Sequence, residues 1–336
     1  MNTIDIEIFG QTIQITTNCA FVYENLSKDF LLFPKKTNSV NEKTIKLQIF
    51  FENPPYQRVP PIDASLHGPG LICYKEKNIN YVVYSEGGLL IYDFAMESGE
   101  LFGKNEFFLY EKSKLTILSR VGELLDKKGL HRIHAFGVVL NQKSLICLLP
   151  MEAGKTTTTF NLLKSNSELK IIADDVCFID HQIKVYPFLL RMGVRDKSLI
   201  EGIPAEFISE IHRPYYGLKY FINPLYQKDR LATQTTLNYL YIGQRAYRIE
   251  TRIEKISKLK CIWPVFESGV FGLGLPQLLE FFVRGDYRFF LQRITFILSR
   301  LIFCLKLILK TKTFVIKIGT DQKLSTEKIL NFLKTQ

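Results

Sequence analysis

A Gly-Lys-Thr triplet at residues 154–156 is the part of this chain best suited to chemistry. It follows an apolar run of strand length at 144–149, and a second apolar run, 171–173, ends in the pair Asp174-Asp175. Backbone amides at a helix start, together with a lysine ammonium, bind phosphates. A threonine hydroxyl and an acid from the next strand hold Mg²⁺. This order of elements therefore predicts a site for a nucleoside triphosphate and its magnesium ion.

The predicted phosphate-binding loop consists of five residues, namely Ala153, Gly154, Lys155, Thr156 and Thr157. It departs from the usual pattern, because Leu149 stands near the point where a glycine is expected and Glu152 brings a carboxylate into the loop. Four consecutive threonines are poor helix formers, so phosphate binding would be the reason for a helix here. The alternative is an ordinary strand–turn–helix with a surface lysine.

His134 opens a strand and a turn that lead into the loop strand, and Asp174-Asp175 closes the strand that follows. With these features, residues 131–195 resemble the HPr kinase/phosphorylase family and its less characterised kinase-like relatives. That family has a fold related to phosphoenolpyruvate carboxykinase, so the resemblance implies an α/β P-loop core. Its members transfer the γ-phosphoryl group of ATP to a serine hydroxyl.

The resemblance also implies roles for individual residues. It makes Lys155 and Thr156 the ligands of phosphate and Mg²⁺, Asp174 the general base, and Asp175 the acid nearest the metal. It places His134 beside the reacting phosphate. Each assignment has a structural alternative, because the acids could cap a turn and a strand histidine could serve packing.

Arg191, Arg195 and Lys219 stand near glycines in segments that look like those of the kinase-like relatives. Guanidinium groups bind phosphate or carboxylate in a bidentate fork, so these residues suit an anionic substrate. A solvated basic loop is the alternative. The glutamate-containing segment of the bifunctional enzymes has no match here, so the resemblance extends neither to the reverse reaction nor to HPr as the acceptor.

Composition limits the partners of the chain. Its 336 residues are 46% hydrophobic and carry a formal net charge of +11, which favours anionic partners. The basic residues are spread along the chain, so no nucleic-acid-binding arm is predicted. Six cysteines stand far apart without a CxxC pair, which is typical of a reducing, cytoplasmic compartment.

Residues 289–309 are strongly apolar but include Arg293, Arg300 and Lys306. Charged residues are costly near a bilayer centre, so this segment is predicted to be an amphipathic helix packed on the sheet. An interfacial membrane helix is the alternative, and a homo-oligomer is left open.

The predicted organisation is a β-rich region at 1–115 followed by an HPr-kinase-like nucleotide-binding domain at 116–336. Strands are expected at Ile4–Phe9, Gln11–Thr16, Thr44–Phe51, Ile79–Ser85, Gly88–Asp93, Glu106–Tyr110 and Lys312–Gly319. Helices are expected at Leu115–Gly129 and at Ser325–Lys334, the latter with Ser325 as its N-cap. The nucleotide core is predicted to span 131–225, and 226–288 shows no clear pattern.

These features together predict an ATP- and Mg²⁺-dependent kinase whose acceptor is a hydroxyl on a small molecule, peptide or protein, and the resemblance implies a hydroxyl of serine type. A second hypothesis is a non-catalytic nucleotide-sensing or partner-binding module with a degenerate loop. A carboxykinase-type reaction is a third, suggested by the shared fold alone.

Overall fold

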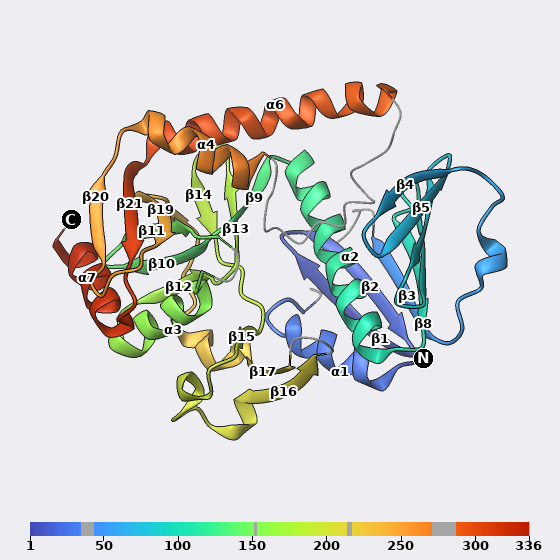
Figure 1. Ribbon diagram of the computed structural model, residues 1–336, viewed down its shortest axis with the longest axis horizontal. Helices are drawn as coiled ribbons and strands as arrows, with labels where there is room; N and C mark the ends of the chain where they lie inside the picture. Colours follow the sequence, from blue (N-terminus) through green and yellow to red (C-terminus); the bar gives the residue numbers. More distant parts are fainter. Residues whose placement is uncertain (35–43, 151–152, 214–216, 271–286, 336) are drawn as a thin grey trace. The chain divides into compact units, whose positions relative to one another are not determined.

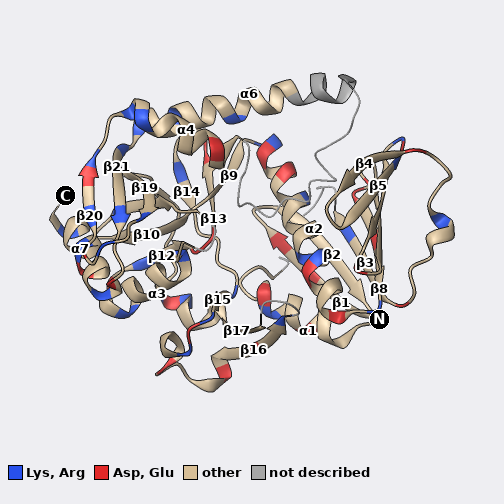
Figure 2. Cartoon of the chain, in the orientation of Figure 1, with Lys and Arg blue, Asp and Glu red and all other residues tan. Residues whose placement is uncertain are grey.

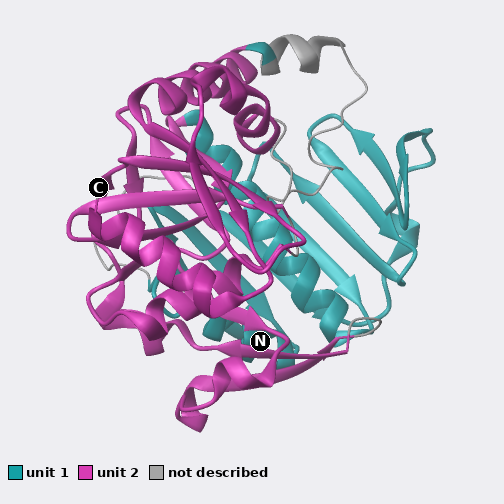
Figure 3. Ribbon diagram, turned by 60° about the vertical axis from the view of Figure 1, so that its left-hand side comes forward, with its two compact units in different colours: residues 1–127, 276–294 teal, residues 128–275, 295–336 magenta. Residues whose placement is uncertain are grey.

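The computed structural model describes residues 1–34, 44–150, 153–213, 217–270 and 287–335, with the backbone alone at 287–293. Its contacts divide the chain into two compact units, one of residues 1–127 with 276–294 and one of residues 128–275 with 295–336 (Figure 3). The first unit's main segment ends with helix α2 (Glu106–Lys127). The expected boundary at residue 115 therefore falls inside a helix.

The first unit is built on an eight-stranded mixed sheet in the order β1-β2-β3-β8-β7-β6-β5-β4 (Figure 1). Helices α1 (Ala20–Asp29) and α2 pack together beside it. The expected hairpin is confirmed, with Ile4 opposite Ile15 across β1 and β2. The strands are β1 (Asn2–Ile8), β2 (Gln11–Thr17), β3 (Ile45–Phe51), β4 (Ala64–Gly68), β5 (Leu71–Glu76), β6 (Ile79–Tyr84), β7 (Gly88–Asp93) and β8 (Ser98–Gly103).

The strand predicted at Glu106–Tyr110 is wrong, because these residues form the first turns of α2. The Asn105 side chain accepts a hydrogen bond from the Phe108 amide and so caps the helix. Phe108, Leu109 and Tyr110 are all buried. A short apolar run that is buried on several sides has no periodicity that distinguishes a helix from a strand.

A buried ion pair ties α2 to the sheet of the first unit. The Arg120 guanidinium, 1% exposed, donates to both carboxylate oxygens of Glu97 at 3.0 and 2.7 Å. Tyr92 donates its hydroxyl to the same carboxylate at 2.8 Å, and Arg120 also pairs with Glu123. The network satisfies charges that would be costly to leave alone in an apolar interior.

Replacing Glu97 with Gln should destabilise the protein by about 3 kcal/mol, because it leaves the buried Arg120 charge without its bidentate partner. The matched control is Glu100→Gln, which removes a more exposed ion pair with Arg58 and should cost less than about 1 kcal/mol. Urea unfolding of both variants measures the difference, and equal costs would contradict this role for the network.

The second unit contains a six-stranded sheet, β12-β10-β11-β19-β21-β20, a four-stranded sheet, β18-β14-β13-β9, and a three-stranded sheet, β15-β17-β16. Its strands are β9 (Leu130–His134), β10 (Phe136–Leu140), β11 (Lys143–Leu148), β12 (Lys170–Ala173), β13 (Val176–Asp180), β14 (Lys184–Tyr186), β15 (Met192–Val194), β16 (Ile208–Arg213), β17 (Gly217–Ile222), β18 (Thr235–Thr236), β19 (Tyr239–Arg245), β20 (Arg252–Lys255) and β21 (Lys312–Ile318). The architecture is therefore mixed α/β.

Helices lie on both sides of the six-stranded sheet (Figure 1). They are α3 (Lys155–Ser165), α4 (Lys258–Gly269), α6 (Tyr287–Lys310) and α7 (Gln322–Thr335). α3 packs against α7, whereas α4 and α6 contribute Val265, Phe303 and Leu307 to the core around β11 and β19. None of the helices in the described residues is long and apolar enough to cross a membrane.

The final strand is confirmed at Lys312–Ile318, but the predicted N-cap of the last helix is wrong. Asp321 occupies that place, since its carboxylate accepts a hydrogen bond from the Leu324 amide. Ser325 lies inside the helix and donates its hydroxyl to the Asp321 carbonyl oxygen. Both residue types cap helices, so the sequence alone did not separate them.

Candidate functional site

Strand directions bring the predicted site together at one edge of the six-stranded sheet. β12 and β11 both run antiparallel to the strand between them, β10, so β12 and β11 are parallel to each other. β11 is also parallel to β19. The carboxyl ends of all three strands therefore lie at the same edge, which is where ligands bind in open α/β sheets.

The Gly-Lys-Thr triplet lies between β11 and α3, as the sequence predicts. Gly154 precedes the helix with φ of +91°, a conformation that favours glycine, and its carbonyl oxygen accepts a hydrogen bond from the Thr158 amide. Thr158 and Thr159 lie on the buried face of α3, so packing against the rest of the unit helps to hold this part of the chain as a helix. The helix start thus presents its first amides toward the space above the sheet edge.

Lys155 is 6% exposed, and its ammonium donates to the carbonyl oxygens of Leu149 and Pro150 at 3.0 and 3.1 Å. Nζ also lies 3.9 Å from Oδ1 of Asp175. Burial lowers the pKa of Lys155, and the charges of Asp175 and Asp174 partly oppose this effect. A cation held at a loop of this form is placed to meet an anion.

The chain passes between the four-stranded and the six-stranded sheet at two neighbouring places. The chain passes from β9 to β10 through Ala135 and from β12 to β13 through Asp174-Asp175. The Ala135 amide donates to the Asp175 carbonyl oxygen at 3.1 Å, which joins the two crossings. His134 and Asp175 are thereby brought together, with Nδ1 and Oδ1 3.5 Å apart.

His134 is 6% exposed, and among the described residues neither of its ring nitrogens has a hydrogen-bond partner. Burial lowers the pKa of the imidazole, the Asp175 charge raises it, and the Lys155 charge lowers it further. The imidazole is therefore neutral at pH 7. A buried ring without a hydrogen bond is costly, so its nitrogens are available to a ligand.

Asp174 accepts a hydrogen bond from the Thr156 hydroxyl through Oδ2 at 2.8 Å. Its other oxygen, Oδ1, is buried and has no hydrogen-bond partner among the described residues. Burial raises the pKa of Asp174 to about 7, and Asp175 adds to the increase, whereas Thr156, Lys155 and Lys219 oppose it. The two acids differ sharply, because the Asp175 side chain is 60% exposed.

These residues fit a magnesium ion that is bound together with phosphates. Mg²⁺ prefers oxygen ligands and uses one or two carboxylates beside substrate phosphates. The Thr156 hydroxyl and the unpartnered Oδ1 of Asp174 supply such oxygens at the start of α3. Thr156 contacts Asp174, whereas the resemblance implies Asp175 as the acid nearest the metal.

The expected substrate-binding residues lie on the three-stranded sheet or next to it. Lys219 is in β17, and its charge acts on Asp174. Arg191 is buried, stacks over the Phe221 ring at 5.0 Å and contacts the Ser209 hydroxyl at 3.3 Å. Arg195 directly follows β15 and is exposed. Lys219 is thus linked electrostatically to Asp174, whereas Arg191 contacts Phe221 and Ser209.

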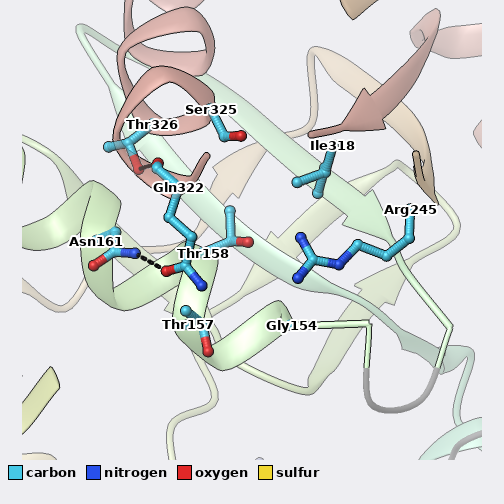
Figure 4. Close-up of a pocket in the computed structure, with 9 residues that line it drawn as sticks. All are labelled: Gly154, Thr157, Thr158, Asn161, Arg245, Ile318, Gln322, Ser325 and Thr326. Atoms are coloured by element: carbon cyan, nitrogen blue, oxygen red, sulfur yellow. Dashed lines mark hydrogen bonds between the residues drawn. The ribbon is translucent and has the colours of Figure 1, made fainter. Parts of the chain in front are cut away.

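Arg245, at the end of β19, is a site residue that the sequence did not reveal. Its guanidinium points toward the start of α3 in Figure 4 and lies 3.9 Å from the position that a Cβ would take on Gly154. It also donates to the Gly319 carbonyl oxygen at 3.3 Å. The sequence does contain one signal for Arg245, because this residue ends the apolar run of β19. That run lies within residues 226–288, for which the sequence showed no clear pattern.

A cavity of about 510 Å³ opens beside the residues that lead into the loop, Leu148, Leu149 and Pro150. Leu149, Ile242 and Pro264 give it apolar walls, while His134 and Glu267 add polar groups. The carbonyl oxygens that hold Lys155 belong to two of its lining residues, Leu149 and Pro150. The cavity therefore adjoins the loop lysine.

Searches of this chain against protein-family models and against curated proteins found no match.

The raised pKa of Asp174 predicts a pH-dependent stability. Because the folded protein keeps a proton up to about pH 7 that the unfolded chain loses near pH 4, the contribution of this group falls as pH rises through that window. Asp174→Asn removes this titration. The melting temperature of the variant relative to wild type should rise by roughly 5 °C or more between about pH 4 and pH 7 and then level off. A difference that stays constant across a series of thermal melts would show that Asp174 titrates normally.

Proposed function

We propose that this protein is an ATP- and Mg²⁺-dependent kinase that transfers the γ-phosphoryl group to a hydroxyl of a small molecule, peptide or protein. The observation that carries the proposal is the convergence of Lys155, Thr156 and the two acids at the start of α3. Thr156 contacts Asp174 at 2.8 Å, and Lys155 lies 3.9 Å from Asp175. Phosphoryl transfer depends mainly on positioning and on neutralising charge, and this arrangement supplies both.

The geometry supports roles for the two acids that are the reverse of those implied by the resemblance, with Asp174 as the metal ligand and Asp175 as the general base. Asp174 is bonded to Thr156 and has a buried free oxygen, which suits a metal ligand. Asp175 is 60% exposed and lies beside His134, so an incoming hydroxyl can reach it. We therefore assign Asp175 as the acceptor of the hydroxyl proton. Mg²⁺, when bound, would supply charge neutralisation at the phosphates.

His134 and Lys155 complete the proposed reaction centre. The neutral imidazole lies 3.5 Å from the Asp175 carboxylate, and its ring nitrogens are available to contact the phosphoryl group or the acceptor. When ATP binds, Lys155 would exchange its two carbonyl partners for phosphate oxygens. This exchange favours binding, because a hydrogen bond between two ions is stronger than one to a neutral carbonyl. Arg245 is placed to bind phosphate from the opposite side of Gly154.

The cavity beside the loop is the proposed acceptor site. Its volume of about 510 Å³ is in the range of small-molecule pockets, and its apolar walls with few polar groups are typical of them. Glu267, half-buried at its rim, favours an acceptor that carries a hydrogen-bond donor or a positive group. An acceptor of this kind differs from the anionic acceptor that the net charge favours. An anionic acceptor would instead be bound by Lys219.

A cytoplasmic location is part of the proposal. All six cysteines are free thiols and are buried, as expected for small apolar side chains in a reducing compartment.

Replacing Lys155 with Met keeps most of the buried volume but removes the charge. It should abolish Mg²⁺-dependent ATP hydrolysis and weaken ATP binding at least 100-fold, by the loss of a charge-assisted contact in a desolvated site. The control is Lys164→Met, on the same helix, whose ammonium contacts the Glu201 carbonyl oxygen away from the loop. Calorimetry with ATP and Mg²⁺ measures the binding. Unchanged binding in Lys155→Met would refute the site.

Asn variants of the two acids should separate their roles. Asp174→Asn should remove the Mg²⁺ dependence of ATP binding, whereas Asp175→Asn should bind ATP and Mg²⁺ like wild type and turn over roughly 100-fold more slowly or worse. Calorimetry with and without Mg²⁺, alongside ATP turnover, distinguishes them. The opposite pattern would restore the roles that the resemblance implies.

A second candidate function is a nucleotide-sensing module without turnover. It is favoured by the loop itself, since Leu149 is buried where a glycine is usual and Lys155 is bonded to two loop carbonyl oxygens. This alternative predicts Mg²⁺-dependent ATP binding without any hydrolysis or transfer, so the same calorimetry and turnover assays decide between the two.

A further inference from the structure

Helix α6 has an apolar face that no described residue of the second unit covers. Its packed face contributes Phe303, Cys304, Leu307 and Ile308 to the core, all 3% exposed or less. Its outer face carries large aliphatic side chains instead of polar ones. They are Ile294, Leu298, Ile302, Leu305 and Leu309, each at least 36% exposed. Because they recur at intervals of three or four residues, they form one stripe along the helix.

Helix α4 lies beside α6 and also exposes large apolar side chains. The two helices run antiparallel, as shown by contacts between Lys258 and Leu309 and, farther along, between Val265 and Cys304. On α4, Leu259 is 78% exposed and Trp263 is 66% exposed. The two positions are one turn apart and share a face. Both of these paired helices thus expose large apolar side chains, and exposed apolar surface on a protein marks an interaction site.

Basic residues outnumber acidic ones around this surface. The sequence of α6 contains no acidic residue, and Figure 2 shows Lys and Arg but no Asp or Glu along its described part. The only acid in α4 is Glu267, which lies one turn after Trp263 on the same helical face and also lines the cavity described above. Lys258, Lys260 and Lys310 lie where α4 begins and α6 ends, and all three are exposed. Lysines beside aliphatic side chains complement anionic headgroups above a hydrocarbon layer.

We propose that the α4–α6 surface, defined as Leu259 and Trp263 of α4 with Leu298, Ile302, Leu305 and Leu309 of α6, docks the protein on an anionic lipid surface. The aliphatic side chains enter the interfacial region, Trp263 lies at the headgroup level, and Lys260 and Lys310 contact phosphate groups. Since the opposite face of α6 stays packed in the core, docking requires no unfolding of the second unit.

The charge pattern favours a membrane over a protein partner. A second copy of this chain carries the same formal net charge of +11, which opposes self-association more than docking on an anionic surface. An exposed tryptophan with aliphatic neighbours and a basic border is the composition of interfacial helices. The surface lies outside the nucleotide site and does not depend on the proposed kinase activity.

Flotation of the full-length protein with phosphatidylcholine vesicles, with and without phosphatidylglycerol, tests the proposal. Wild type should bind the vesicles that contain phosphatidylglycerol and bind less at high salt. Ile302→Asn with Leu305→Asn should lower the binding constant at least tenfold, because two buried aliphatic contacts are lost. Lys260→Glu with Lys310→Glu should remove the preference for phosphatidylglycerol, since each lysine near an anionic surface contributes roughly fivefold.

The matched control is Leu324→Asn, which changes an exposed leucine on α7 of the same unit and should bind like wild type. Thermal melts show that each variant is folded, and the lysine variant tests the proposal even where the apolar one does not fold. Absence of wild-type binding to phosphatidylglycerol vesicles would overturn the proposal. So would a wild-type dimer, seen by light scattering, that the Ile302/Leu305 variant converts to monomer while vesicle binding is unchanged.

Discussion

The hydrogen bond from the Ala135 amide to the Asp175 carbonyl oxygen fixes the geometry on which the candidate site depends. It joins two strand crossings, so that β9 and β13 pair in one sheet while β10 and β12 pair in another. His134 and Asp175 are brought together only because both chain segments turn at the same place. The adjoining β11 then ends beside them and delivers the loop lysine.

The charges gathered at this edge explain why its residues behave unlike ordinary surface groups. Lys155, His134 and Asp174 share a region from which water is largely excluded, so burial shifts each pKa toward the neutral form. None of the three is fully compensated by the others. Perturbed groups of this kind gather at functional sites, because a ligand with complementary charge restores the balance.

Helix α6 carries apolar side chains on two opposite faces. One face closes the core over the six-stranded sheet, which is the packing expected of an amphipathic helix. The opposite face is also aliphatic and is left exposed with α4 beside it. Of the basic residues in this segment, Arg300 is buried and bonded to the Val270 carbonyl oxygen. Its charge therefore lies in the packed face and not in the exposed apolar stripe.

The sequence alone determined the local features: the β10–β11 hairpin, the strand before the loop, the glycine that begins α3 and the final strand are all where pattern and turn chemistry placed them. These depend on near neighbours in the chain. Only the tertiary structure decided that Thr156 meets Asp174, that Arg245 approaches Gly154, and that Glu106 starts a helix. Such contacts join residues distant in sequence or depend on burial against other elements, and neither periodicity nor propensity carries that information.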